Sequence, residues 1–158
     1  MSNDYKLYRI GWLLLLVSLS MGLVVAHAQE PAPVAFGEAE MSIGEHKLVV
    51  EYAYNFDQRQ RGLMYRESLC DNCGMLFKFD LPRYAGFWMK NTQVPLDIAY
   101  IDAAYQIVDI KPMYPFKLDP VHSSAPVLYA LEMNQGWFAA NEINVGDSVV
   151  ITRIEFAQ

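Results

Sequence analysis

The sequence predicts a mainly β domain, a compact antiparallel β-sandwich or small barrel with one short helix. Three observations support this fold class. Short runs rich in β-branched and aromatic residues recur along the chain, turn signals separate them, and only one segment carries clear helix signals. A parallel α/β fold is the alternative, and it needs more helix than the sequence offers.

The first half of the predicted domain holds a strand, the helix and a second strand. Residues 47–55 (KLVVEYAYN) have the composition of a strand. A helix is expected over 58–67, because Asp57 with a glutamine three residues later resembles a capping box. Gly62 inside this helix is less favourable than alanine by about 1 kcal/mol, which suggests a close-packed neighbour. Residues 75–79 form the next expected strand.

The second half continues with short strands and turns. Residues 87–92 are expected to be extended, and Pro95 ends or interrupts this segment. A hairpin is expected over 96–111, followed by a loop with four prolines over 112–126. The last elements expected are a strand over 127–133, one helical turn over 134–142 and a final strand over 148–155.

The N-terminal residues 1–28 resemble a secretory signal peptide. Lys6 and Arg9 give a positive start, an uncharged apolar core follows, and Ala-His-Ala ending at Ala28 has the small-x-small pattern of a cleavage site. An uncleaved membrane anchor is the alternative, and the apolar core is at the lower limit of what spans a bilayer. Cleavage is favoured because Pro31 follows the cleavage pattern closely.

Cleavage after Ala28 would place the protein in the periplasm or outside the cell, with a linker over 29–40 and the β domain over 41–158. The mature chain would have 130 residues, and its formal charge would change from −6 to −7. An acidic chain gains no electrostatic attraction to nucleic acid or anionic lipid. We therefore expect no nucleic-acid partner, and no membrane contact after cleavage.

Two cysteines, Cys70 and Cys73, are predicted to form a small disulfide, as expected in an oxidising compartment. A thiol-redox pair is one alternative, but such a thiol usually lies at a helix N-terminus after a strand. A metal site is another, although only His46 and His122 remain as histidines after cleavage. No metal and no cofactor are expected.

The run Phe-Trp-Met-Lys-Asn-Thr at 87–92 is the main candidate for a binding surface. In an extended strand, Trp88 and Lys90 would share one face, where an aromatic ring and polar groups suit an amphipathic ligand. The alternative is that Trp88 packs in the core and Lys90 pairs with Asp97 or Glu132. The candidate ligand-binding residues are Arg66, Trp88, Lys90, Asn91, Asp97 and Glu132.

Catalytic motifs are largely missing from the sequence. It contains no Gly-x-Ser-x-Gly, no His-Glu-x-x-His and no phosphate-binding loop. A Ser/His/Asp arrangement would require the fold to bring Asp97 or Asp109 to His122 and its neighbouring serines.

Four motifs in the same order resemble the DUF192 family, also called UPF0127. They are Gly62-Leu-Met-x-Arg66, Gly74-Met-Leu-Phe-x-Phe79, Phe87-Trp-Met-Lys-Asn-Thr92 and Pro95-Leu-Asp-Ile98. A closing segment around Tyr129-Ala-Leu-Glu132, Gly136 and Val145-Gly-Asp147 is also similar. The resemblance implies a β-rich domain, often exported, and no catalytic residue can be carried over. The cysteine pair is an addition to the shared pattern.

Together these features favour an exported, non-enzymatic domain that binds a small ligand or an envelope partner. The alternative is an envelope enzyme, either a hydrolase or a thiol-redox protein, that uses the same polar cleft or the cysteine pair.

Overall fold

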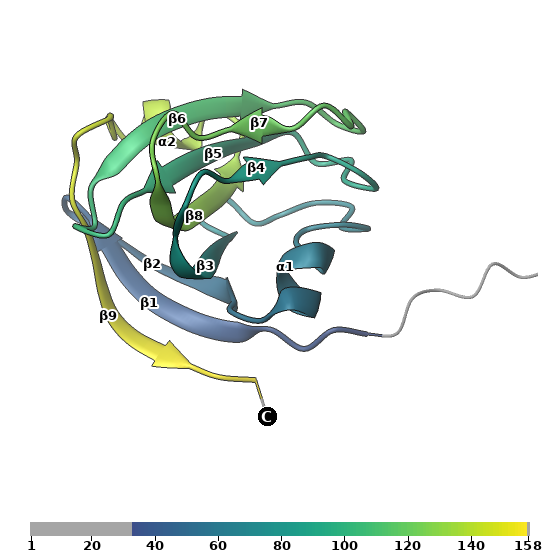
Figure 1. Ribbon diagram of the computed structural model, residues 1–158, viewed down its shortest axis with the longest axis horizontal. Coiled ribbons are helices and arrows are strands. Elements are labelled where there is room, and N and C mark those ends of the chain that lie inside the picture. Colours follow the sequence, from purple (N-terminus) through teal and green to yellow (C-terminus); the bar gives the residue numbers. More distant parts are fainter. Residues whose placement is uncertain (1–32, 158) are drawn as a thin grey trace, which may run out of the picture. The chain divides into compact units, whose positions relative to one another are not determined.

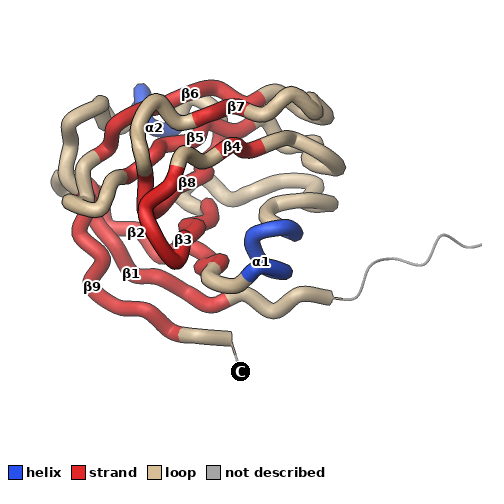
Figure 2. The backbone as a smooth tube through the Cα atoms, viewed as in Figure 1, coloured by secondary structure: helices blue, strands red, loops and turns tan. Residues whose placement is uncertain are grey.

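The computed structural model describes residues 33–157, so the predicted signal peptide and the start of the predicted linker lie outside the described residues. Seven strands form one sheet in the order β6-β5-β8-β3-β2-β1-β9. All neighbours are antiparallel except β2 and β3. Strands dominate the fold, and the helices are short (Figures 1 and 2). The strands are β1 Gly37–Ile43, β2 His46–Ala53, β3 Gly74–Arg83, β5 Leu96–Ile101, β6 Ile107–Met113, β8 Val127–Asn134 and β9 Val149–Glu155.

The sheet curls until its two edge strands meet at one end. An isolated bridge joins Gln106, just before β6, to Ser148, just before β9. Beside it, the N–H of Ile107 donates to the carbonyl of Asp147 at 2.9 Å. Away from these contacts β6 and β9 separate, so the sheet does not close into a barrel (Figure 1). The prediction of a mainly β, mostly antiparallel domain is confirmed.

Strand β1 starts earlier than the expected domain boundary at residue 41. It begins at Gly37 and pairs along its length with β2 and along most of it with β9. The end of the predicted linker, 37–40, is therefore part of the sheet.

Helix α1 (Phe56–Arg61) differs from the predicted helix at both ends. Asn55, not Asp57, is the N-cap, and its side chain accepts from the N–H of Gln58 at 2.9 Å. The side chain of Gln58 accepts in return from the N–H of Asn55, which completes a capping box two residues earlier than predicted. The helix ends at Gly62, whose φ of 46° favours glycine.

The second helix, α2 (Trp137–Ala140), lies within the segment where one helical turn was expected. Within residues 33–157 there is no helix with the length and apolar character needed to cross a membrane.

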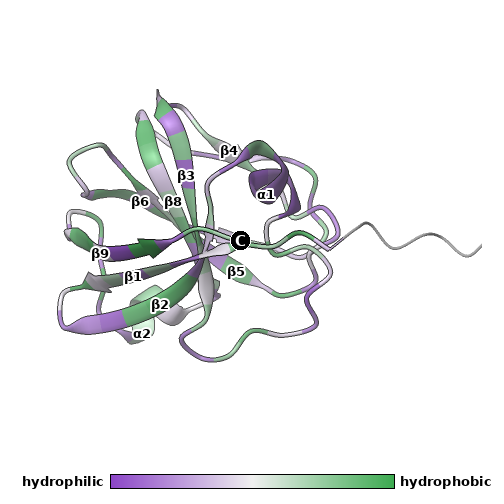
Figure 3. Ribbon diagram, turned by 90° about the horizontal axis from the view of Figure 1, so that it is seen from below, coloured by the Kyte–Doolittle hydropathy of each residue, from purple (hydrophilic) through white to green (hydrophobic). Residues whose placement is uncertain are grey.

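Side-chain alternation gives the central strands two buried faces. Leu76 and Leu131 point into the core enclosed by the curled sheet, together with residues of β1, β2 and β9. Phe77 and Ala130, one position along, point to the opposite face and pack in a second core. In Figure 3 the outer helix α1 is largely hydrophilic (purple), whereas the strands carry both hydrophilic (purple) and hydrophobic (green) residues, as side-chain alternation requires.

A two-stranded sheet and a loop cover the second core. Strand β4 (Gly86–Phe87) pairs with β7 (Val121–His122). The prediction of an extended segment over 87–92 is wrong beyond Phe87. After Phe87 the chain turns, and Asn91 adopts a φ of 53°, which breaks the two-residue alternation expected there.

Candidate functional site

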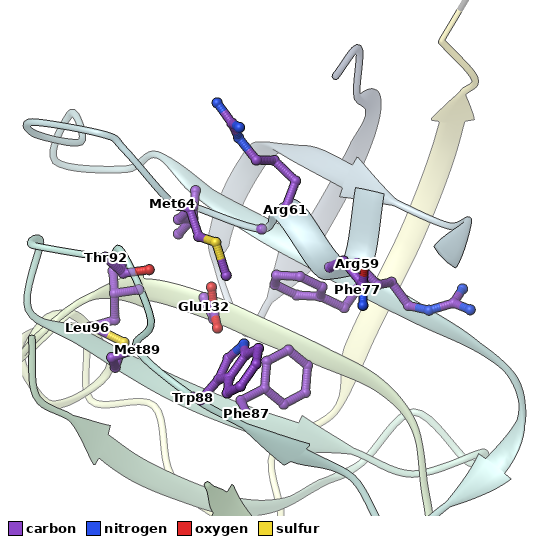
Figure 4. A pocket seen from close by; sticks show the side chains of 13 residues that line it. Arg59, Arg61, Met64, Phe77, Phe87, Trp88, Met89, Thr92, Leu96 and Glu132 are labelled. Carbon is purple, nitrogen blue, oxygen red and sulfur yellow. The ribbon is translucent and has the colours of Figure 1, made fainter. Parts of the chain in front are cut away.

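A small pocket opens between the outer face of the sheet and the segments that cover it. Its volume is about 30 Å³, roughly twice the 10–15 Å³ that one water molecule needs. It is lined by residues of α1 and the turn after it, of β3, of the segment from β4 to β5, and of β8 (Figure 4): Arg59, Gln60, Arg61, Gly62, Leu63, Met64, Phe77, Phe87, Trp88, Met89, Thr92, Leu96 and Glu132.

Glu132 of β8 is the acidic group of this pocket. Its position in the strand gives it the same face as Ala130, so its carboxyl group points to the covered outer side of the sheet. Only 5% of the residue is exposed, which is unusual for a glutamate. Burial raises the pKa of Glu132 from 4.5 to about 8.

The Glu132 carboxyl group has no hydrogen-bond partner among residues 33–157. No side-chain nitrogen or oxygen that is fully buried in this part of the chain is left unpaired. The oxygens of Glu132 must therefore keep contact with the space of the pocket. A carboxyl group in this position can receive a hydrogen bond or a positive charge from a bound molecule.

Aromatic and thioether side chains form the walls around Glu132. The rings of Phe77 and Phe87 meet edge to face, with 4.9 Å between their centroids. In Figure 4 the Glu132 carboxyl lies between Met64 and Phe77 on one side and Trp88 and Phe87 on the other. These walls leave room for very little water at the carboxyl group, which is why its charged form is disfavoured.

Two arginines line the edge of the pocket, but their charged ends are directed elsewhere (Figure 4). Arg59 Nη1 donates to the carbonyls of Tyr54 at 2.7 Å and Lys78 at 3.0 Å. The guanidinium carbon of Arg61 lies 4.5 Å from the centroid of the Tyr65 ring. Neither arginine forms an ion pair with Glu132.

A larger groove continues from the pocket. It has a volume of about 240 Å³ and shares Arg59, Gln60, Phe87 and Trp88 with the pocket lining. Trp88 forms part of both and is 48% exposed. Pocket and groove together lie just below the range of about 300–1,000 Å³ that is usual for small-molecule sites.

Three loops that frame the pocket are held together by backbone contacts. The N–H of Tyr65 donates to the carbonyl of Asn91 at 2.8 Å, and the N–H of Phe116 donates to that of Thr92 at 3.2 Å. Tyr65, Asn91 and Phe116 all have φ between 53° and 66°, a region that costs a non-glycine residue about 1–2 kcal/mol. Such conformations persist only where surrounding contacts impose them.

The structure brings some of the six predicted site residues together. Trp88 and Glu132 line the same pocket. The Lys90 ammonium lies 5.3 Å from the centroid of the Trp88 ring. Asn91 Nδ2 donates to the hydroxyl of Tyr65 at 2.7 Å, at the edge of the same group of loops.

The other two predicted residues lie elsewhere and have structural contacts. Arg66 forms an ion pair with Glu51 of β2 at 2.6 Å. Asp97 Oδ2 accepts from the N–H of Gly136 at 2.7 Å, before α2. The alternative, a pairing of Lys90 with Asp97 or Glu132, is not among the ion pairs of residues 33–157.

Met64, Met89 and Phe77 also line the Glu132 pocket, and none of them was among the predicted site residues. Met89 and Phe77 are buried. Gly62 was the available signal. A methyl group at its Cα would lie 3.4 Å from the Phe77 ring, so its expected close neighbour is a wall of the pocket.

The disulfide prediction is confirmed. The sulfur atoms of Cys70 and Cys73 lie 2.08 Å apart. Asn72, between them, accepts from Nε1 of Trp137, and the carbonyl of Cys70 accepts from the side chain of Asn134. The bridge shapes a loop that packs against the start of α2, and neither cysteine lines the Glu132 pocket.

The polar residues near His122 do not form a catalytic triad. Ser123 Oγ accepts from the N–H of Ala85 at 3.0 Å, and Asp109 Oδ2 accepts from the N–H of Ser124 at 2.6 Å. Burial works to raise the pKa of Asp109, but hydrogen bonds from Ser124 and Lys111 outweigh it and lower that pKa. Within residues 33–157, no cluster of three or more His, Cys, Asp or Glu residues suits a metal ion.

The curled sheet and its covered outer face define a compact β domain with one acidic group buried beneath a loop cover. The chain belongs to the DUF192 family, described as "Uncharacterized ACR", which matches residues 39–151. None of the curated proteins matches it.

Two crystal structures are similar to this chain. A candidate transcription regulator from Sinorhizobium meliloti 1021 has 33% identity and a TM-score of 0.73, over 76% of this chain and 98% of that one. A protein of unknown function from Novosphingobium aromaticivorans DSM 12444 has 31% identity and a TM-score of 0.68, over 76% of this chain and 93% of that one.

Proposed function

We propose that this domain is an exported, non-enzymatic module that binds a small ligand, and that the pocket at Glu132 is its binding site. The observation that carries the proposal is the Glu132 carboxyl group, which is buried, faces a cavity and has no hydrogen-bond partner within residues 33–157. A nearly buried carboxyl group with no partner from its own chain is unfavourable, and native proteins keep such groups mainly where they have a use.

Two further features support a binding role. Trp88 is large, half-exposed and part of both the pocket and the groove, so it can cover the apolar part of a ligand. The framing loops hold three residues in the unfavourable positive-φ region, and such conformations cluster at ligand sites.

Export is proposed from the sequence of residues 1–28 and from the Cys70–Cys73 disulfide, because structural disulfides persist mainly in oxidising compartments. A thiol-redox role has less support, since the cysteine pair lies in a different surface region from the pocket. A hydrolase is the second candidate, because a carboxyl group with a raised pKa in a pocket is suited to general acid catalysis.

The test is a fragment screen by thermal shift on the mature protein, repeated with Glu132→Gln and Trp88→Ala. Ligands of the pocket should stabilise the wild type and lose most of their effect in both variants. Glu45→Gln is the matched control, because Glu45 is an exposed acid in the turn between β1 and β2, outside the pocket lining. If every stabilising fragment acts equally on all four proteins, the pocket is not the binding site.

A hydrolase would be recognised by a different result. Turnover of ester or glycoside reporter substrates by the wild type, lost in Glu132→Gln, would replace the binding role with an enzymatic one.

A further inference from the structure

Glu132 differs from the other groups around the pocket in its chemistry. Apart from Gln60, Thr92 and two arginines, the lining around Glu132 consists of aromatic, thioether and aliphatic residues and Gly62. Arg59 and Arg61 contribute to the edge, and their guanidinium groups contact Tyr54, Lys78, Asp80 and the Tyr65 ring instead of the cavity. Among the lining residues, Glu132 is therefore the one acidic side chain of the cavity.

We infer that the pocket takes the protonated amine end of its ligand, with the ammonium group at the Glu132 carboxylate and the first carbon atoms between Phe87, Trp88 and Phe77. This inference rests on the binding function proposed above and gives the chemical class of the ligand.

The size of the cavity fits such an end group. A volume of about 30 Å³ accepts about two water molecules, and an ammonium group with its first methylene is of similar size. The remainder of the ligand would lie in the groove of about 240 Å³ that shares Phe87 and Trp88. A large rigid head group would not enter.

The aromatic walls favour a cation. The faces of aromatic rings carry a negative quadrupole that attracts ammonium groups, most strongly for tryptophan. Trp88 already has one such contact, with the Lys90 ammonium 5.3 Å from its ring centroid. A ligand amine would combine this attraction with a direct ion pair to Glu132.

An anionic end group would be disfavoured at the same place. It would have to share a poorly hydrated cavity with a carboxyl group, and no cation is directed into that cavity from its lining. The whole chain also has a formal charge of −6, which attracts cations over longer distances.

The protonation state of Glu132 before ligand binding depends on the groups that face it. They are Arg59 and Arg61 from α1, which are engaged elsewhere, and Tyr100 of β5, whose hydroxyl donates to the carbonyl of Val121. None of them supplies a charge that would keep Glu132 ionised in the empty pocket. When an ammonium group binds near neutral pH, the neutral carboxyl group releases its proton to solvent and the O–H bond is replaced by an ion pair with the N–H donors. One proton leaves for each ligand bound, and no oxidation or reduction occurs.

The experiment is isothermal titration calorimetry of the mature protein with three probes of equal length, pentylamine, pentan-1-ol and pentanoate. Titrations at pH 7 in phosphate and in MOPS, which differ in ionisation enthalpy, report proton release. We expect pentylamine to bind most tightly, to release about one proton, and to tighten about tenfold per pH unit between roughly pH 6 and pH 8. Glu132→Gln should weaken pentylamine by about tenfold or more, and the control Glu45→Gln should have no effect.

The possible failures are distinct. If pentan-1-ol or pentanoate binds as tightly as pentylamine and Trp88→Ala abolishes this binding, the amine class is wrong while the pocket remains the binding site. If pentylamine binds equally to wild type and Glu132→Gln, or does not bind, the inference is overturned. The proposed function fails as well only if the fragment screen also yields no compound that depends on Glu132 and Trp88.

Discussion

The rings of Phe77 and Phe87 meet edge to face, 4.9 Å between their centroids, and both line the pocket that contains the Glu132 carboxyl group. Phe77 belongs to the central strand β3, and Phe87 belongs to β4, which covers that strand. This pair therefore joins the sheet to its cover, and it forms part of the apolar wall that limits the water around Glu132.

Truncating Phe77 should strongly destabilise the domain. Only 1% of this residue is exposed, and phenylalanine-to-alanine changes in cores cost about 3–5 kcal/mol. Urea denaturation of Phe77→Ala should show a loss in that range. Phe56→Ala is the matched control, because Phe56 is 64% exposed and its loss should change stability by about 0.5 kcal/mol or less. Equal losses for the two variants would contradict the assignment of Phe77 to the second core.

Glu132 should make the domain less stable as pH rises through the neutral range. Its folded pKa of about 8 lies above the ordinary value of 4.5. Between these values the folded state holds a proton that the unfolded state has lost, so stability falls by about 1.4 kcal/mol per pH unit from this group. Below pH 4.5 both states are protonated, above about pH 8 both are ionised, and the contribution no longer changes with pH.

The measurement is urea denaturation from pH 5 to pH 9 on wild type and Glu132→Gln. Glutamine does not titrate, so the variant should gain stability relative to wild type as pH rises towards 8. Glu45→Gln should follow the wild-type curve. If the difference between wild type and Glu132→Gln is constant across this range, then Glu132 does not carry the raised pKa.

Asp97 should contribute to folding and not to ligand binding. Its carboxylate accepts from the N–H of Gly136 at 2.7 Å, and removing one such acceptor typically costs about 1–3 kcal/mol. Asp97→Ala should lower the unfolding free energy within that range and leave the fragment-induced thermal shifts unchanged. If Asp97→Ala keeps its stability but loses the fragment-induced thermal shifts, Asp97 is part of the binding site.

The disulfide should have a small effect on stability and none on the pocket. Closing a four-residue loop stabilises by about 2 kcal/mol at most on the chain-entropy estimate. The double variant Cys70→Ser with Cys73→Ser should lose no more than this in urea denaturation and should retain ligand-induced shifts. A complete loss of folding would show that the loop contacts to Trp137 and Asn134 depend on the bridge.

Export should leave a defined N-terminus. If the signal peptide is cleaved after Ala28, mass spectrometry of the protein from a bacterial periplasmic extract should find Gln29 as the first residue. A protein that retains Met1 and stays in the membrane fraction would favour the anchor instead.

Local patterns in the sequence were enough to predict much of the fold. The hairpin at 96–111 and the last strand over 148–155 correspond to β5, β6 and β9, because β-branched residues and side-chain alternation act over a few neighbours. The disulfide followed from the spacing of Cys70 and Cys73 and from the expected compartment. The helix position was nearly right, although its cap was placed at Asp57 instead of Asn55.

The candidate site was predictable only in part. Trp88, Lys90 and Asn91 lie in one loop and were found together, but Asp97 and Arg66 were assigned by closeness in sequence and have contacts elsewhere. The alternation expected after Phe87 failed because the chain turns at Asn91 to cover the second core. Such a turn depends on contacts with the loops at Tyr65 and Phe116, which are distant in the sequence.

Residue types and their spacing thus determined the strands, the turns, the disulfide and the family of this protein, because these depend on short-range geometry and composition. The environment of Glu132 depended on the fold. A glutamate in an alternating strand is ordinarily solvated on one face of the sheet. Here β4, α1 and their loops cover that face, and burial by segments far apart in the chain raises the pKa of this carboxyl group in an aromatic pocket.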